Sequence, residues 1–212
     1  MTTDLLTLTQ LLSPSFPVGA FAYSSGLESA IAGGAVTSRA TLEAWLTDLI
    51  CLGSGRSDAV LLNLAYAADP ADIASLDTTA RAFAATAERL RETDLQGAAF
   101  CETVSAVWGH DLPPLCYPVG VGRVGKLLNL DPQDVTALYL HAFAANICAA
   151  AMRLVPLGQI DGQKALAALK PYCVQIAGKM QTATLDDLHS ATWVADIMSM
   201  RHETQYSRVF RS

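Results

Sequence analysis

The segment from Asp131 to Leu154 constrains the fold more than any other part of this chain. Its apolar residues recur at spacings of three and four, as Val135, Leu138, Tyr139, Ala142, Phe143, Ile147, Ala150 and Leu154. This spacing places them along one face of an α-helix. Asp131 can cap that helix, and Pro132 has the fixed φ that suits a first helical turn. The segment therefore predicts one long helix, whose many alanines would let a neighbouring helix approach closely.

Helix signals also recur on both sides of this segment. We expect helices over 38–53, from 57 towards 68, from Pro70 through 91, and from 163 to 169 before Pro171. No segment alternates apolar and polar residues between hairpin turns, so strands are not expected. No internal repeat or low-complexity linker divides the 212 residues. We predict an all-α, single-domain multi-helix bundle spanning 1–212.

The charge balance argues against two classes of partner. The net charge is −6 and no basic run occurs, whereas nucleic acid and anionic lipid both attract concentrated Lys and Arg. The most apolar stretch, 138–155, contains His141, Asn146 and Arg153, so we do not expect a membrane span. Asp4 stands where a secretory signal would carry a basic residue. We expect a cytoplasmic protein that binds neither nucleic acid nor membrane.

The share of hydrophobic residues is high, at 51% of the chain. A small globule has limited interior for so much apolar surface, so part of it is expected at protein interfaces. This surplus favours a homodimer, in which part of the alanine-rich long helix would meet a second copy.

The metal-binding residue types are scattered. Five cysteines and four histidines are present, namely Cys51, Cys101, Cys116, Cys148, Cys173, His110, His141, His189 and His202. The cysteines are odd in number, form no C-x-x-C pair and stand mostly in apolar sequence, which is typical of reduced, buried thiols. A stable metal site needs several convergent ligands. We therefore expect no intrinsic cofactor or metal site, and any metal handling would be shared with a partner.

The stretch GVGRVGKL, from Gly120 to Leu127, offers an alternative function as a nucleotide-binding enzyme. It satisfies G-x-G-x-x-G and nearly satisfies the P-loop pattern. However, Leu127 stands where a P-loop needs a hydroxyl, and three prolines interrupt the segment before it. In the other interpretation, the glycines permit close packing and Lys126 is solvated. No other catalytic pattern is present, so we expect a protein that is not an enzyme.

The segment SFPVGAFAYSSGLES, residues 15–29, is called the N-terminal motif here. It combines a Pro-Gly turn with clustered aromatic residues and a carboxylate. We predict that Phe21 and Tyr23 are partly interfacial and that Glu28 orients the segment, against an interpretation in which all three only stabilise the fold.

Two further segments carry unusual patterns. In MRLVPLGQIDGQK, a helix end meets a polar loop whose side chains could bind partners or cap helices, namely Gln159, Asp161, Gln163 and Lys164. The segment RHETQYSRVFRS, residues 201–212, is called the tail. It mixes three arginines with two aromatic residues, and both types are favoured anchors of interfaces. Its candidate anchors are Tyr206, Arg208, Phe210 and Arg211.

Taken in order, these segments resemble the F-type accessory family of urease. Its members share a motif like FPVGAFAYSSGLE, a loop like PLGQIDGQ and an ending like HETQYSRVFRS. The segment RLRETDLQG, at 89–97, is also similar to the family's R-E-x-D-x-Q-G region, so the resemblance covers nearly the whole chain. Val209 stands where relatives often carry leucine, and Phe21 where tyrosine is an alternative.

The resemblance implies an all-helical homodimer that bridges two other accessory proteins, the D-type (also called H-type) scaffold and the G-type GTPase. The assembly would deliver nickel to apo-urease, and this chain would position the GTPase without catalysis of its own. On this basis we predict that the polar loop faces the GTPase. We also predict that the tail is mobile in the free protein and is ordered by the scaffold, with Arg208 as its main anchor.

Overall fold

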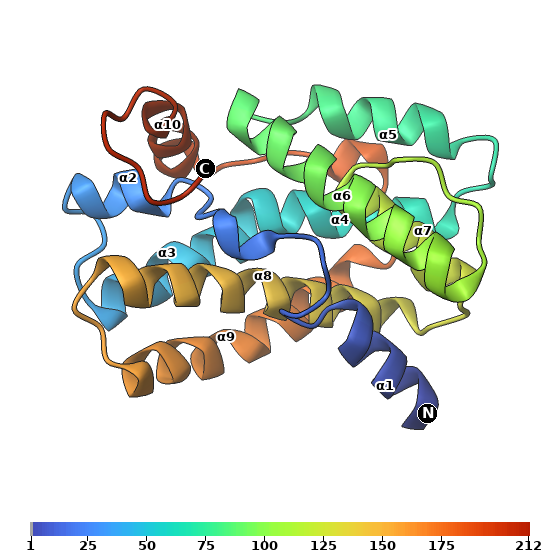
Figure 1. The fold of residues 1–212 in the computed structure, drawn as a ribbon, viewed down its shortest axis with the longest axis horizontal. Coiled ribbons are helices and arrows are strands. Elements are labelled where there is room, and N and C mark those ends of the chain that lie inside the picture. Colours follow the sequence, from blue (N-terminus) through green and yellow to red (C-terminus); the bar gives the residue numbers. More distant parts are fainter. Residues whose placement is uncertain (1) are drawn as a thin grey trace.

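The computed structural model describes residues 2–212, and every regular element in that part of the chain is a helix (Figure 1). The α-helices are α1 (Thr2–Leu11), α2 (Leu27–Ala32), α3 (Arg39–Leu52), α4 (Ser54–Ala67), α5 (Ile73–Ala82), α6 (Ala87–Trp108), α7 (Tyr117–Leu127), α8 (Pro132–Leu154), α9 (Gln159–Met180) and α10 (Trp193–His202). Two short 3-10 helices are η1 (Ala20–Ala22) and η2 (Leu185–Asp187). The prediction of an all-α fold is confirmed.

The helix α8 is the long helix that the apolar spacing predicts. The Asp131 carboxylate caps it by accepting the backbone N–H of Gln133 at 2.9 Å and that of Asp134 at 3.0 Å. The helix α9 packs along α8, and α2, α3, α4 and α7 contact it elsewhere (Figure 1). By length and composition alone, α8 could cross a membrane. Half of its most apolar window is buried by these neighbours, as in the core helix of a globular fold.

The predicted helix boundaries are right where a side chain caps the helix. The Ser38 hydroxyl accepts the Thr41 N–H while the Thr41 hydroxyl accepts the Ser38 N–H, and α3 ends before Gly53 as expected. The prediction of one helix from Pro70 through 91 is wrong in two respects. Residues 69–72 form a turn, so α5 begins at Ile73, and the stretch expected to continue through 91 is two helices. The second of these, α6, begins afresh because the Thr86 hydroxyl accepts the Arg89 N–H at 3.0 Å.

The prediction for the polar loop is also wrong, because residues 159–164 form the first turns of α9. The helix begins four residues before the predicted start and continues through Pro171 to Met180. Proline removes one hydrogen bond from a helix interior. Pro171 lies on the exposed side of α9, while Leu169 and Cys173 are buried on either side of it. The helix therefore keeps its packing across the proline.

The glycine-rich stretch lies inside α7, so the nucleotide-binding alternative is wrong. A phosphate-binding loop presents free backbone N–H groups, whereas these belong to a helix that packs against α4 and α6. Gly122 approaches the Leu62 carbonyl of α4 too closely for a side chain to fit. Lys126 is exposed, with its ammonium 5.4 Å from the centre of the Tyr66 ring. The structure therefore agrees with the other interpretation, in which the glycines permit close packing of helices.

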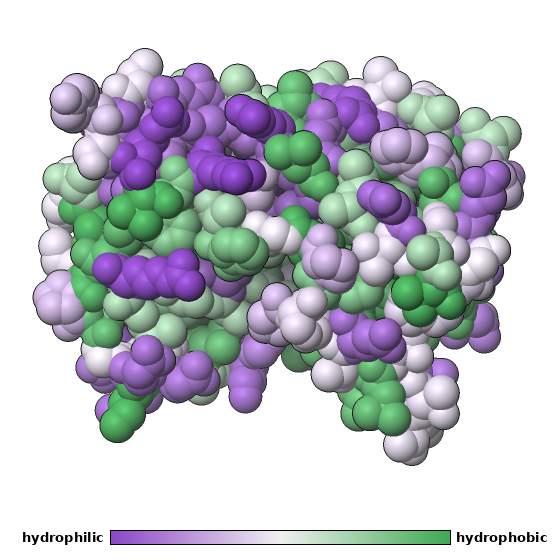
Figure 2. Space-filling model, viewed as in Figure 1, coloured by the Kyte–Doolittle hydropathy of each residue, from purple (hydrophilic) through white to green (hydrophobic). Residues whose placement is uncertain are grey.

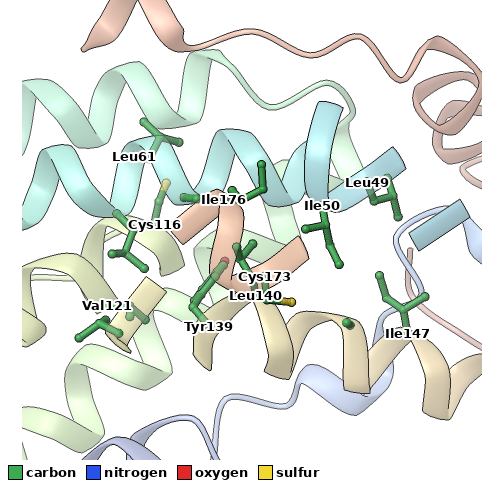
Figure 3. Close-up of a cluster of buried hydrophobic side chains, with 14 of the residues drawn as sticks. Leu49, Ile50, Leu61, Cys116, Val121, Tyr139, Leu140, Ile147, Cys173 and Ile176 are labelled. Atoms are coloured by element: carbon green, nitrogen blue, oxygen red, sulfur yellow. The ribbon is translucent and has the colours of Figure 1, made fainter. Parts of the chain in front are cut away.

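One cluster of buried apolar side chains joins α3, α4, α7, α8 and α9, as the close-up in Figure 3 shows. Four of the cysteines are buried in the protein, Cys51 is half-buried, and all five thiols are free. Burial raises the pKa of both Cys148 and Cys173 to about 11, which keeps these thiols protonated. Among residues 2–212, no group of three or more His, Cys, Asp or Glu side chains is arranged to hold a metal ion.

Candidate functional site

The N-terminal motif and the tail form one site, although they lie at opposite ends of the chain. Figure 1 shows the tail leaving α10 and turning back towards α2. The Arg211 N–H donates to the Ala22 carbonyl at 2.8 Å, and the Ser24 N–H donates to the Ser212 carbonyl at 2.9 Å. The two segments are thereby joined by backbone hydrogen bonds, which depend little on side-chain identity.

Gly26 allows α10 to approach the motif. Its φ of 79° lies in the left-handed region, which favours glycine. A Cβ at this position would lie 2.9 Å from the backbone nitrogen of Ser199 in α10. Of the helices, α10 packs chiefly against α2, which begins directly after this glycine.

Glu28 is the carboxylate that holds the tail in place. It is 6% exposed and accepts the backbone N–H groups of Val209 at 2.8 Å and Phe210 at 2.9 Å. Its Oε2 also lies 3.3 Å from Nε2 of His202. Glu28 therefore holds the tail backbone against the motif.

Two carboxylates of α6 extend this arrangement. Oε2 of Glu88 lies 2.7 Å from Nδ1 of His202, and its Oε1 accepts the Arg208 guanidinium at 2.7 Å. Glu92 accepts the Ser212 hydroxyl at 3.1 Å. Burial raises the pKa of Glu92, although Arg89 opposes this shift. Three carboxylates from α2 and α6 thus face the tail.

The two aromatic residues predicted at the interface differ in exposure. Phe21 is 68% exposed, so its ring is accessible to a partner. The prediction for Tyr23 is wrong, because Tyr23 is 4% exposed and belongs to the core. Its carbonyl accepts the Asn146 side chain of α8 at 3.1 Å, which holds this part of the motif against the bundle.

The tail, which we predict to be mobile in the free protein and ordered by the scaffold, lies against the body in this structure. The tail is tied to the body by Glu28, Glu88 and Glu92, and the Phe210 side chain is buried. After His202 it is not helical, so Tyr206 and Phe210 do not share a helical face. Tyr206 is fully exposed. The sequence did not reveal these acceptors, because they lie more than a hundred positions away.

The four polar residues predicted to face the GTPase lie together at the start of α9. Gln159, Gln163 and Lys164 are exposed and Asp161 is half-buried. The Lys164 ammonium lies 3.7 Å from the Asp161 carboxylate, within one turn of the helix. In Figure 1 this turn lies at the lower left, away from α10 at the upper left. The structure thus separates these residues from the site formed by the motif and the tail.

A further candidate surface, on α10, was missed in the sequence. Of its ten residues only Ala195 and His202 are buried. Trp193, Ile197 and Met200 are 72%, 47% and 50% exposed, and their spacing of four and three places them on one face. That spacing was a readable signal in the sequence. Figure 2 shows polar residues gathered near α10 and the tail at the upper left, with apolar residues beside them.

A cavity of about 410 Å³ lies between α4, the start of α6 and α10. Asp58 and Arg89 are part of its lining, with Oδ2 of Asp58 2.5 Å from Nη2 of Arg89 and 2.7 Å from the Tyr139 hydroxyl. Burial alone would lower the pKa of Arg89, but Asp58 and Glu92 raise it above its ordinary value. Burial and Asp58 together raise the pKa of Tyr139 well above its usual range. These groups neutralise and hydrogen-bond one another, as in a structural network.

The family model of UreF matches residues 36–170, which is more than half of the chain. This chain belongs to the UreF family. A protein of Roseobacter denitrificans named urease accessory protein UreF is 53% identical over 214 residues, covering all of this chain and 96% of the relative. Proteins of the same name from Cereibacter sphaeroides and Ruegeria pomeroyi are 51% and 47% identical, with 100% and 97% of each relative covered. These UreF alignments extend beyond the family model and include both the N-terminal motif and the tail.

Proposed function

We propose that this UreF chain is a non-catalytic assembly factor of urease that bridges the D-type (H-type) scaffold and the G-type GTPase in nickel delivery. The observation that carries the proposal is membership of the family, with relatives named urease accessory protein UreF along the whole chain. In the cavity between α4, α6 and α10, Asp58 is paired with Arg89 and hydrogen-bonded to Tyr139, which favours a structural role for these groups over catalysis. Nickel is then the cargo of the assembly, and this chain contributes surfaces to it.

The α10 face and the tail are the proposed surface for the scaffold. Trp193, Ile197 and Met200 form an exposed apolar face, and an amphipathic helix of this kind fits an apolar groove on a partner. Tyr206 and Val209 add exposed apolar area from the tail, and Phe21 adds an aromatic ring from the motif. Aromatic side chains often dominate the free energy of binding at protein interfaces.

The start of α9 is the proposed surface for the GTPase. Gln159, Gln163 and Lys164 offer amide and ammonium groups that are free of packing constraints. Because this turn and α10 are separate in the fold, both partners can bind one copy at the same time (Figure 1). Separation of the two surfaces is what a bridging protein needs.

A homodimer in the cytoplasm completes the proposal. Half of the apolar window of α8 is not buried, and Ala149 is exposed on that helix. A small-residue helix face of this kind suits close packing against a second copy. Light scattering of the purified chain at micromolar concentration should report a dimer, and a monomer would contradict this part.

Co-purification tests the bridging role directly. Tagged scaffold, untagged UreF chain and untagged GTPase are expressed together and separately. We expect the scaffold to retain the GTPase only when the UreF chain is present. Retention of the GTPase without this chain, or failure of the scaffold to retain this chain at all, would overturn the proposal.

A further inference from the structure

His202 is fully buried, and both of its ring nitrogens face carboxylates. Nδ1 lies 2.7 Å from Oε2 of Glu88, and Nε2 lies 3.3 Å from Oε2 of Glu28. A neutral imidazole has one donor and one acceptor nitrogen, whereas an imidazolium has two donors. The protonation state of the ring therefore depends on whether each of the two carboxylates needs a hydrogen-bond donor from it.

Both carboxylates already act as acceptors. Glu28 accepts the backbone N–H groups of Val209 and Phe210, one on each oxygen. Glu88 accepts the guanidinium of Arg208. Ionised carboxylates can only accept, so each nitrogen of the ring between them must carry a hydrogen. We propose that His202 is held as an imidazolium and acts as a proton-controlled latch, which keeps the tail on the body while protonated and releases it on deprotonation.

The charges around the ring explain why the latch depends on the proton. The carboxylates of Glu28 and Glu88 balance the imidazolium of His202 and the guanidinium of Arg208. Loss of the proton leaves a net negative charge in a buried place and turns one ring nitrogen towards a carboxylate oxygen as a second acceptor. This arrangement of two facing acceptors is repulsive. Since Glu28 also holds the tail backbone, the repulsion weakens the attachment of the tail.

The other charged groups near the ring already have their own partners or lie in solvent. Glu203 directly follows α10 and accepts the Ala87 N–H at 2.9 Å, at the start of α6. Arg201 precedes His202 and is exposed. On α6, Glu92 accepts the Ser212 hydroxyl and lies 3.4 Å from Arg89. Glu28 from α2 and Glu88 from α6 are the carboxylates in hydrogen-bond reach of the ring.

The sign of the pH dependence follows from proton counting. The closed tail binds one proton more than the released tail once His202 begins to titrate, so closure weakens as the pH rises. Histidine side chains change charge between about pH 5 and 8. The contacts between the tail and the body should therefore be strongest at the acid end of this range. Closure should weaken about tenfold for each pH unit only over the range in which the closed tail keeps this proton and the released tail has lost it.

Hydrogen exchange of the full-length wild-type chain tests this directly. Protection factors of the tail amides are measured by mass spectrometry from about pH 5.5 to 8.5, a range centred on histidine titration, after correction for intrinsic exchange. We expect tail protection to fall with rising pH while protection of α8 stays constant. The carbon-bound ring proton of His202, followed by NMR, should titrate over the same pH range.

Two variants separate the latch from a general effect of pH. His202→Gln should lower tail protection and remove its pH dependence, whereas His189→Gln, at an exposed histidine before α10, should keep the wild-type profile. Tail protection in the wild type that does not change with pH would overturn the proposal. So would a His202 ring that NMR shows to be neutral at about pH 5.5, a readout that needs no variant to fold.

Discussion

Glu28 accepts the backbone N–H of Val209 at 2.8 Å across 181 positions of sequence. The same side chain also serves Phe210 and His202. Glu28→Ala would leave all three donors without this acceptor in a buried place, and should lower the free energy of unfolding by about 2–4 kcal/mol. Urea denaturation followed by circular dichroism measures it. Asp48→Ala, at an exposed position of α3, is the control, and equal stability of both variants would contradict the role of Glu28.

Gly122 packs against the α4 backbone at Leu62, where a Cβ cannot fit. Gly122→Ala should force α7 and α4 apart and cost about 1–3 kcal/mol, as other overpacked positions do. Gly158→Ala is the matched control, because a Cβ there meets open space. Thermal melting compares the two variants. A Gly122→Ala protein as stable as the control would show that α7 does not pack tightly against the α4 backbone at this glycine.

Arg208 pairs with Glu88 but is 41% exposed, so the ion pair should add little to stability. We expect Arg208→Ala to lower the free energy of unfolding by less than about 1 kcal/mol. If the tail surface binds the scaffold, the same variant should co-purify poorly with it. Full scaffold binding by Arg208→Ala would remove this residue from the proposed interface.

The exposed face of α10 gives a sharper test of the scaffold surface. The triple variant Trp193→Ser, Ile197→Ser and Met200→Ser should keep the melting temperature, because these side chains pack little against the body. It should lose most of its affinity for the scaffold. Leu95→Ser with Val107→Ser, at exposed positions of α6, controls for loss of surface apolar area. Loss of binding in the control as well would point to a non-specific effect.

The start of α9 is tested by combined alanine substitution of Gln159, Asp161, Gln163 and Lys164. The variant should fold normally, because these side chains lie at the surface and their one ion pair is exposed. It should retain the scaffold but lose the GTPase in the co-purification experiment. Lys170→Ala with Gln175→Ala, further along the same helix, is the control. Normal GTPase recruitment by the quadruple variant would rule out this surface.

Local signals predicted those parts of the fold that local contacts build. The Asp131 cap and the apolar spacing predicted α8, and Ser38 predicted the start of α3. The predicted helix end before Pro171 was wrong, because the position of this proline on the exposed side of α9 depends on how that helix packs. The contacts of the tail could not be predicted, since nothing near Arg208 or Phe210 in sequence indicates the acceptors on α2 and α6. The sequence motifs thus identified the candidate residues. Which of these side chains are buried and which are exposed depends on the tertiary structure.

The pairing of the motif with the tail also has a consequence for biosynthesis. Ribosomes make the motif well before the tail, so the bundle can fold around α8 while the acceptor groups of Glu28 still lack their tail partners. Completion of this corner must wait until the tail has left the ribosome. A product that lacks the tail would therefore present an incomplete surface, and a partner that binds this corner would distinguish chains with the tail from chains without it.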